Sequence, residues 1–290
     1  MRSGHHQPGL TRSSRRALRV AALAVFGSVG ALVMALGIEA CGSDSGTSGA
    51  RVALATRVEM VSDGQSFTTA QGWSVTLTRA VISTGPFYYF DGAPPLVLLE
   101  QRPRWQLAVD VLGIASALAH PGHYKAGEAL GQMLDAWSVD LLAGGADLPT
   151  GEGVTGLYRS ASFSFTSPPE GPMAGELASH AAIVEGLAER DGDEPRRFRA
   201  VADLADVERS AANGFIDGCQ FDELDIEGDG LVTVAVTPKI WFDLVDFSEL
   251  QPAADDAAVQ FPVDSQPKIA FALGLAQLSA YEFVYSPAVP

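Results

Sequence analysis

The sequence has 290 residues, of which 19 are basic and 35 acidic, so the formal net charge at pH 7 is −16. Five of the basic residues and one of the acidic residues fall within the first forty positions, and the remainder therefore carries 14 basic and 34 acidic residues, a net charge of −20. So acidic a surface repels nucleic acid and anionic lipid, which excludes both as expected partners. Such a charge attracts cations without specificity. The alternative is that the acidic side chains only keep the surface well solvated.

The first forty residues have the order of a secretory signal. Basic side chains come first (Arg2, Arg12, Arg15, Arg16 and Arg19), and residues 20–38 then run without a charge. The basic end of such a segment stays in the cytoplasm while its apolar helix enters the bilayer. We therefore expect residues 1–40 to be a signal peptide or an N-terminal membrane anchor, with the rest of the chain outside the cytoplasm.

The apolar run ends in Ile38-Glu39-Ala40-Cys41. This resembles the lipobox of bacterial lipoproteins, although Glu39 stands where that family has a small neutral residue. The resemblance implies that Cys41 carries lipid and becomes the new N-terminus, and Gly42 after it implies that sorting to an outer membrane is permitted. Residues 41–50 are rich in Gly and Ser and are expected to form a flexible tether. The alternatives are an uncleaved anchor or a signal that is cleaved elsewhere.

Residues 51–290 are expected to form one extracytoplasmic domain that is mainly β, an antiparallel β-sandwich with one or two short helices. Alternating apolar and polar residues, separated by turn signals about every ten residues, favour this class over βαβ units. The expected strands are residues 73–82, 87–90, 157–166, 181–189, 198–204, 215–221, 231–237 and 281–285, and the expected helices are 104–119 and 268–280. Gly85-Pro86 breaks the pattern between the first two strands, which predicts that they form a hairpin.

The chain has two cysteines, Cys41 and Cys219. If Cys41 carries lipid, Cys219 has no partner, and we expect it to be buried or unpaired. A bridge between the two is open only to a chain that is not lipidated.

Three histidines follow the N-terminal segment, and two of them, His120 and His123, share one Pro-Gly turn. Imidazole suits copper and zinc, and two rings in one turn can point at a single ion. His180, at the start of an expected strand, is a candidate third ligand, and Glu128 is the nearest carboxylate that could complete or orient the site. The alternative is a structural turn in which these histidines pack or bond to the backbone.

Two acidic stretches are weaker candidates. Asp225-Ile-Glu-Gly-Asp229-Gly230 resembles the start of a calcium loop but has Val236 where the bidentate Glu would stand, so a hairpin turn is the better interpretation. Asp243 and Asp246 lie three residues apart in an aromatic segment, and on one helical turn they would share a face. They are candidates for general acid and base, or simply solvated acids between packed rings.

The layout from about Phe67 to Tyr285 resembles periplasmic copper-binding proteins of the methanobactin-associated kind. The shared features are a signal and a tether, β-hairpins, a His-containing turn, and a late Asp-Gly strand that leads into Trp241-Phe-Asp243. The resemblance implies metal binding in the cell envelope, and only the histidines carry over residue by residue.

The sequence thus predicts a cell-envelope lipoprotein, attached to a membrane by an N-terminal lipid or helix, that faces the periplasm or the cell surface and binds copper or zinc. It contains no Gly-x-Ser-x-Gly elbow, P-loop or dinucleotide fingerprint, so an enzyme is not expected. The alternative is a structural or adhesive envelope lipoprotein with no ligand site.

Overall fold

The computed structural model describes residues 49–95, 125–211, 214–252 and 257–288, all of which belong to one compact unit that begins at Asp44. The expected helix over residues 104–119 lies outside the described residues, as do His120, His123 and Cys41. Among the residues that are described, no helix is long and apolar enough to cross a bilayer.

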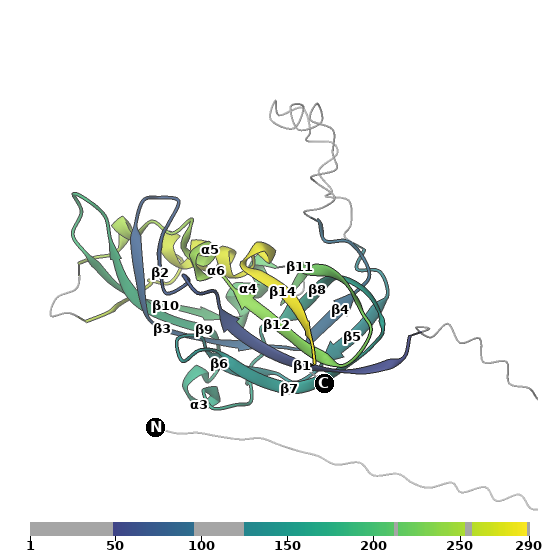
Figure 1. Cartoon of the computed structure of the whole chain (residues 1–290). Helices are drawn as coiled ribbons and strands as arrows, with labels where there is room; N and C mark the ends of the chain where they lie inside the picture. The colour runs from purple at the N-terminus through teal and green to yellow at the C-terminus, as the bar shows by residue number, and fades with distance from the viewer. Residues whose placement is uncertain (1–48, 96–124, 212–213, 253–256, 289–290) are drawn as a thin grey trace, which may run out of the picture. The chain divides into compact units, whose positions relative to one another are not determined.

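Eight strands close into a barrel (Figure 1). In order around the barrel they are β1 (Arg51–Met60), β12 (Gly230–Val236), β14 (Tyr281–Pro287), β11 (Phe215–Ile226), β8 (Gly156–Ser164), β4 (Phe87–Phe90), β5 (Ala129–Met133) and β7 (Ala146–Val154). β12 pairs in parallel with β1, and β14 pairs in parallel with β11, whereas the other neighbours are antiparallel.

Two of the strands that build the barrel alternate clearly. Val52, Leu54, Thr56 and Val58 of β1 are buried, and the residues between them face outward. β12 repeats the pattern over Gly230–Val236, in which every second residue is buried. A period of two places all apolar side chains of a strand on one face, which here becomes the inside of the barrel.

A second sheet has the order β13 (Val259–Gln260), β10 (Arg196–Asp203), β9 (His180–Glu189), β3 (Ser74–Thr84) and β2 (Ser66–Thr68), and β6 (Trp137–Asp140) also pairs with β3. The mainly β class is confirmed, but the strands do not form the predicted sandwich, because eight of them close on themselves. The predicted hairpin of residues 73–90 is wrong. β3 pairs with β2, β6 and β9, and after the cis Gly85-Pro86 bond the chain enters the barrel as β4.

Four α-helices are described: α3 (Ala174–Leu177), α4 (Leu204–Ser210), α5 (Pro238–Phe242) and α6 (Gln266–Leu275). The predicted helix at residues 268–280 is confirmed in its first part, since α6 ends at Leu275 and the 3₁₀ turn η5 (Leu278–Ala280) leads into β14. Leu177 of α3 packs with Val81, Ile183 and Val201 on one face of the second sheet. α5 and α6 pack on each other and contribute Trp241, Phe242, Phe271 and Leu275 to the main core.

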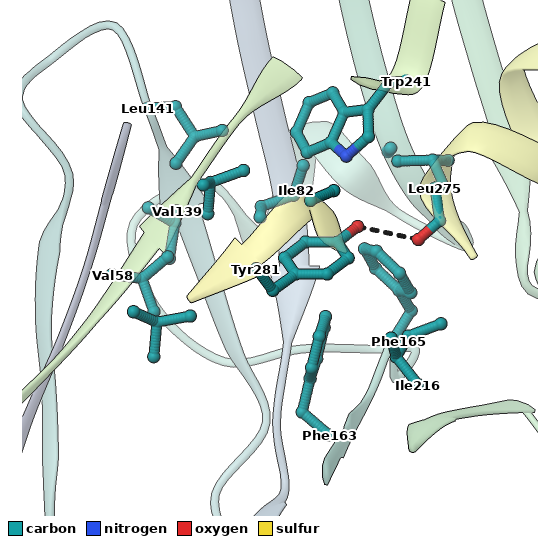
Figure 2. Packing of buried hydrophobic residues seen from close by; sticks show 14 of the residues in the cluster. Val58, Ile82, Val139, Leu141, Phe163, Phe165, Ile216, Trp241, Leu275 and Tyr281 are labelled. Carbon is teal, nitrogen blue, oxygen red and sulfur yellow. Dashed lines mark hydrogen bonds between the residues drawn. The ribbon is translucent and has the colours of Figure 1, made fainter. Parts of the chain in front are cut away.

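Both sheets share that core, and Tyr281 lies at their junction (Figure 2). Its ring meets Phe163 of the barrel edge to face at 4.6 Å, and its hydroxyl donates to the Leu275 carbonyl at 2.8 Å. Ile82 and Val139 of the second sheet lie in the same cluster. Burial raises the pKa of Tyr281 well above its ordinary value. The main core thus spans both sheets of the described residues.

The described interior of the barrel is filled. Phe87, Tyr89, Phe221 and Phe283 are buried, and Tyr89 lies edge to face with Phe221 at 5.8 Å and with Phe283 at 6.1 Å. An eight-stranded barrel is just wide enough for side chains to fill it. A ligand therefore has to bind outside the barrel, at its rim or on its surface.

Candidate functional site

Glu128 lies directly before β5, where the chain returns to the barrel after leaving it at the end of β4. Its backbone N–H donates to Asp91 Oδ1 at 2.7 Å, and the Asp91 N–H donates back to the Glu128 carbonyl at 3.2 Å. Gly92 N–H donates to the Ala126 carbonyl at 2.9 Å. These bonds join the two ends of the connection between β4 and β5 and fix the backbone of Glu128.

Gly127 allows the two chains to approach this closely. Its φ is +81°, and a Cβ on it would lie 2.0 Å from Asp91 Oδ1. A side chain at this position would therefore break the bond between Asp91 and Glu128 and strain the backbone as well.

Asp91, Glu128 and Arg159 are among the residues that line a surface pocket of about 250 Å³. Leu130 and Leu157 supply part of its apolar wall. Two carboxylates offer oxygen ligands to a cation, and the guanidinium limits the negative charge that they create. Among the described residues, this pocket is where the predicted ligand Glu128 has a second carboxylate beside it.

His120 and His123, the two histidines on which the metal prediction mainly depends, lie outside the described residues. In the sequence, His123 precedes Glu128 by five residues. The described part of the chain contains no group of three or more His, Cys, Asp or Glu side chains that could hold a metal ion.

His180 begins β9, and its Nδ1 lies 2.5 Å from Asp203 Oδ1 at the end of β10. Hydrogen bonding of Nδ1 to a carboxylate leaves Nε2 as the ring atom able to bind a metal. Asp203 is also 3.8 Å from Lys268 Nζ, so an ammonium lies close to the pair.

The structure does not bring His180 and Glu128 together. Ala182, two residues after His180, pairs with Ile82 near the end of β3 that leads into β4. Glu128 lies beside Asp91, beyond the other end of β4. The two predicted ligands are thus at opposite ends of one strand.

The predicted hairpin turn at residues 225–230 is wrong in its pairing, because β14 lies between β11 and β12. The turn instead connects strands that are not neighbours. Asp229 Oδ1 accepts from the Ala53 N–H at 2.7 Å, and its carbonyl accepts from the Tyr285 hydroxyl at 3.0 Å. Asp229 therefore has a structural role in tying β1 and β14 to the turn.

Asp243 and Asp246 also have structural partners. Both carboxylate oxygens of Asp243 lie 2.8 Å from Lys239 Nζ, and its Oδ1 accepts from the Ala70 N–H at 2.9 Å. Asp246 caps the 3₁₀ turn η3 (Phe247–Glu249) by accepting from the Ser248 N–H at 3.0 Å. These contacts favour the structural interpretation of the two acids over the catalytic one.

Cys219 is buried and free, as expected of a cysteine without a partner. Burial raises the pKa of its thiol, with a smaller contribution from Asp217. A thiol held neutral in this way is a poor nucleophile and a poor metal ligand.

Sequence reasoning missed an ionic cluster between α4 and α6. The Asp206 carboxylate accepts from the Asp203 N–H at 2.9 Å, lies 3.1 Å from Lys268 Nζ, and binds Arg209. Burial acts to raise the pKa of Asp206, but these donors outweigh it, so the pKa lies below its ordinary value. The spacing Asp203-x-x-Asp206 before an apolar run is a helix-start signal, which could have located α4 but not Lys268, sixty-two residues away.

No protein-family model matches this chain, and no curated protein matches it. Among solved structures, MbnP from Methylosinus trichosporium is similar over 78% of this chain and 88% of that chain, with 12% sequence identity and a TM-score of 0.36. A TM-score and an identity this low carry no argument about function. The function has to be argued from the residues themselves.

Proposed function

We propose that this protein is a cell-envelope lipoprotein whose domain binds a copper or zinc ion through His120 and His123, with Glu128 as a further ligand or as a group that orients them. The observation that supports it is the fixed position of Glu128. The Glu128 N–H donates to the Asp91 carboxylate and the Glu128 carbonyl accepts from the Asp91 N–H, which holds the Glu128 backbone at the pocket, five residues after His123. Scarce histidines that closely precede a carboxylate in the sequence have the composition of a transition-metal site.

His180 is not part of this proposal. It lies at the opposite end of β4 from Glu128, and its Nδ1 is engaged by Asp203. It therefore offers a matched control, because its removal deletes an imidazole without touching the proposed ligands.

The metal site is tested by the metal content of residues 44–290, the compact unit. We expect close to one copper or zinc ion per chain after loading and dialysis, loss of that ion in the His120→Ala, His123→Ala double variant, and a weaker loss in Glu128→Gln. His180→Ala should retain the metal. Equal, sub-stoichiometric metal in the unsubstituted domain and the double variant would sink the proposal.

Attachment to the envelope is tested separately on the full chain. Mass spectrometry of the mature N-terminus should find a lipid-modified Cys41, and Cys41→Ser should abolish the added mass. An unmodified Cys41 on a chain that keeps residues 1–40 would show that the apolar segment is itself the anchor.

A structural or adhesive envelope protein is the second candidate. It is favoured by the filled interior of the described barrel. The same metal measurement separates the two candidates, since this one predicts no stoichiometric ion in any variant.

A further inference from the structure

Exposed apolar side chains gather between α4 and α6. Six large apolar side chains are exposed in the described part of the chain, and three of them, Val263, Ile269 and Leu273, line one surface pocket of about 280 Å³. Their exposed fractions are 74%, 52% and 39%. Isolated exposed apolar residues are common on protein surfaces. Three around one pocket form an apolar surface whose burial against a partner would be favourable.

The base of this hollow is rigid. Lys268 and Arg209 both bind the buried carboxylate of Asp206, which joins α6 to α4. Arg209 also donates through Nε to the Ala205 carbonyl at 3.1 Å, yet 68% of its side chain remains exposed. The Arg209 guanidinium is thus hydrogen-bonded along one edge and exposed to solvent along the other. Its side chain has already lost much of the conformational entropy that contact with a partner would cost.

Opposite charges flank the apolar centre. Arg209 lies on the α4 side, and Asp264, which is exposed, lies on the side where the chain enters α6. We name the surface formed by Arg209, Val263, Asp264, Ile269, Ala272 and Leu273 the α4–α6 patch. An apolar centre between a cation and an anion is complementary to a copy of itself turned by 180°.

We propose that the α4–α6 patch is a contact surface between two copies of this chain, in which Arg209 of each copy faces Asp264 of the other and Ile269 and Leu273 pack across the two-fold axis. Elsewhere the acidic domain opposes the approach of a second copy, because its net charge beyond residue 40 is −20. At the patch the exposed charges balance. An anionic amphiphile would bind best to a surface with only positive charge, and a basic partner to one with only negative charge. The α4–α6 patch has one exposed charge of each sign.

The patch lies away from residue 49, the first residue that the structure describes. α5 begins two residues after β12 ends at Val236, which pairs with Met60, and α6 packs on α5. Residue 49 lies beside Thr155 at the other end of β1. Ten strand residues span about 30 Å. A second copy at the patch therefore leaves residue 49 uncovered.

The test is the mass of residues 44–290 in sedimentation equilibrium from low micromolar to about 1 mM protein, a range that covers weak dimers. We expect reversible dimers, and a loss of at least about tenfold in affinity for Ile269→Asp, Arg209→Glu and Asp264→Arg singly. The Arg209→Glu, Asp264→Arg double variant should restore the dimer, because it exchanges the two charges. Leu134→Asp, which replaces an exposed leucine outside the patch, should leave the dimer unchanged.

Circular dichroism melts of each variant verify that it folds. A domain that stays monomeric throughout this range overturns the proposal, as does a dimer that tolerates Ile269→Asp, or a double variant as weak as either single charge reversal. None of these outcomes depends on metal, so the test is independent of the proposed metal site.

Discussion

The hydroxyl of Tyr158 donates to the carbonyl of Val154 at 2.8 Å, with the Leu130 carbonyl a second acceptor at 2.9 Å. Val154 ends β7 and Leu130 belongs to β5, and these two strands pair over only two residue pairs, Gly131 with Gly153 and Gln132 with Glu152. A phenol from inside the barrel thus closes a seam where the backbone ladder is short.

Tyr158→Phe keeps the buried ring and removes this hydroxyl. We expect it to lower the free energy of unfolding by about 1 kcal/mol, which for a domain of this size is a fall of roughly 2–4 °C in the melting temperature. Calorimetry measures both. Tyr88→Phe is the control, because Tyr88 is only partly buried and its ring contact with Phe215 does not depend on its hydroxyl. Equal melting temperatures for all three proteins would show that the seam does not need Tyr158.

Alkaline pH should open the same seam. Burial, opposed by the bond to Val154, raises the pKa of Tyr158 to about 12 from 10.0, so the fold favours the neutral phenol. The resulting stabilisation is complete below pH 10 and is lost as the pH rises toward 12. Chemical denaturation at a series of pH values should show this loss, and it should be smaller in Tyr158→Phe. If Tyr158→Phe and the unsubstituted domain lose stability identically as the pH rises, the loss comes from other groups, such as Tyr89 and Tyr281, whose pKa values burial also raises.

Gly153→Ala should destabilise the domain by several kcal/mol, as overpacked interiors do. A Cβ there would lie 2.6 Å from the Tyr158 hydroxyl and 2.8 Å from Leu54 Cδ1. Gly175→Ala in α3 is the matched control. Its Cβ would meet nothing within 4 Å, and alanine favours the helix, so the expected effect is neutral or slightly stabilising. Thermal melts compare the two, and equal effects would contradict the tight fit around Tyr158.

Lys268→Met should destabilise the domain by roughly 3 kcal/mol at pH 7, because it leaves the buried Asp206 carboxylate with one fewer cation. Arg209→Gln should have less effect, at most about 1 kcal/mol, since that side chain is largely exposed. The pKa of Asp206 lies below 3.8, so its ion pairs stabilise the fold above about pH 4 and are lost as the pH falls further. The difference between Lys268→Met and the unsubstituted domain should therefore shrink in acid.

Local composition and turn signals located several regular strands. β12, with buried residues at every second position, lies where it was expected, as do β9, β10 and β14. β7 was missed because Ala146–Val154 contains Pro149 and two glycines, which argue against a strand. The structure accommodates them: Pro149 lies at the register shift between β7 and β1, and Gly153 leaves room for the Tyr158 ring.

Closure of the barrel was not predictable in the same way. It depends on β14 lying between β11 and β12, and on β1 pairing in parallel with β12, whose residues follow it by about 180 positions. Local patterns carry no information about such distant pairs. The same holds for the sites: His180 could be recognised as a candidate ligand, but its partner Asp203 lies on the neighbouring strand, and Lys268 reaches Asp206 from a helix far along the chain.

The position of β14 also bears on when this domain can fold. Residues 281–287 supply the strand between β11 and β12, so the barrel cannot close until nearly the whole described chain has been synthesised. Contacts of such long sequence separation slow folding and delay its cooperative step. Until its last described strand emerges, the chain therefore lacks the fold whose core the barrel completes.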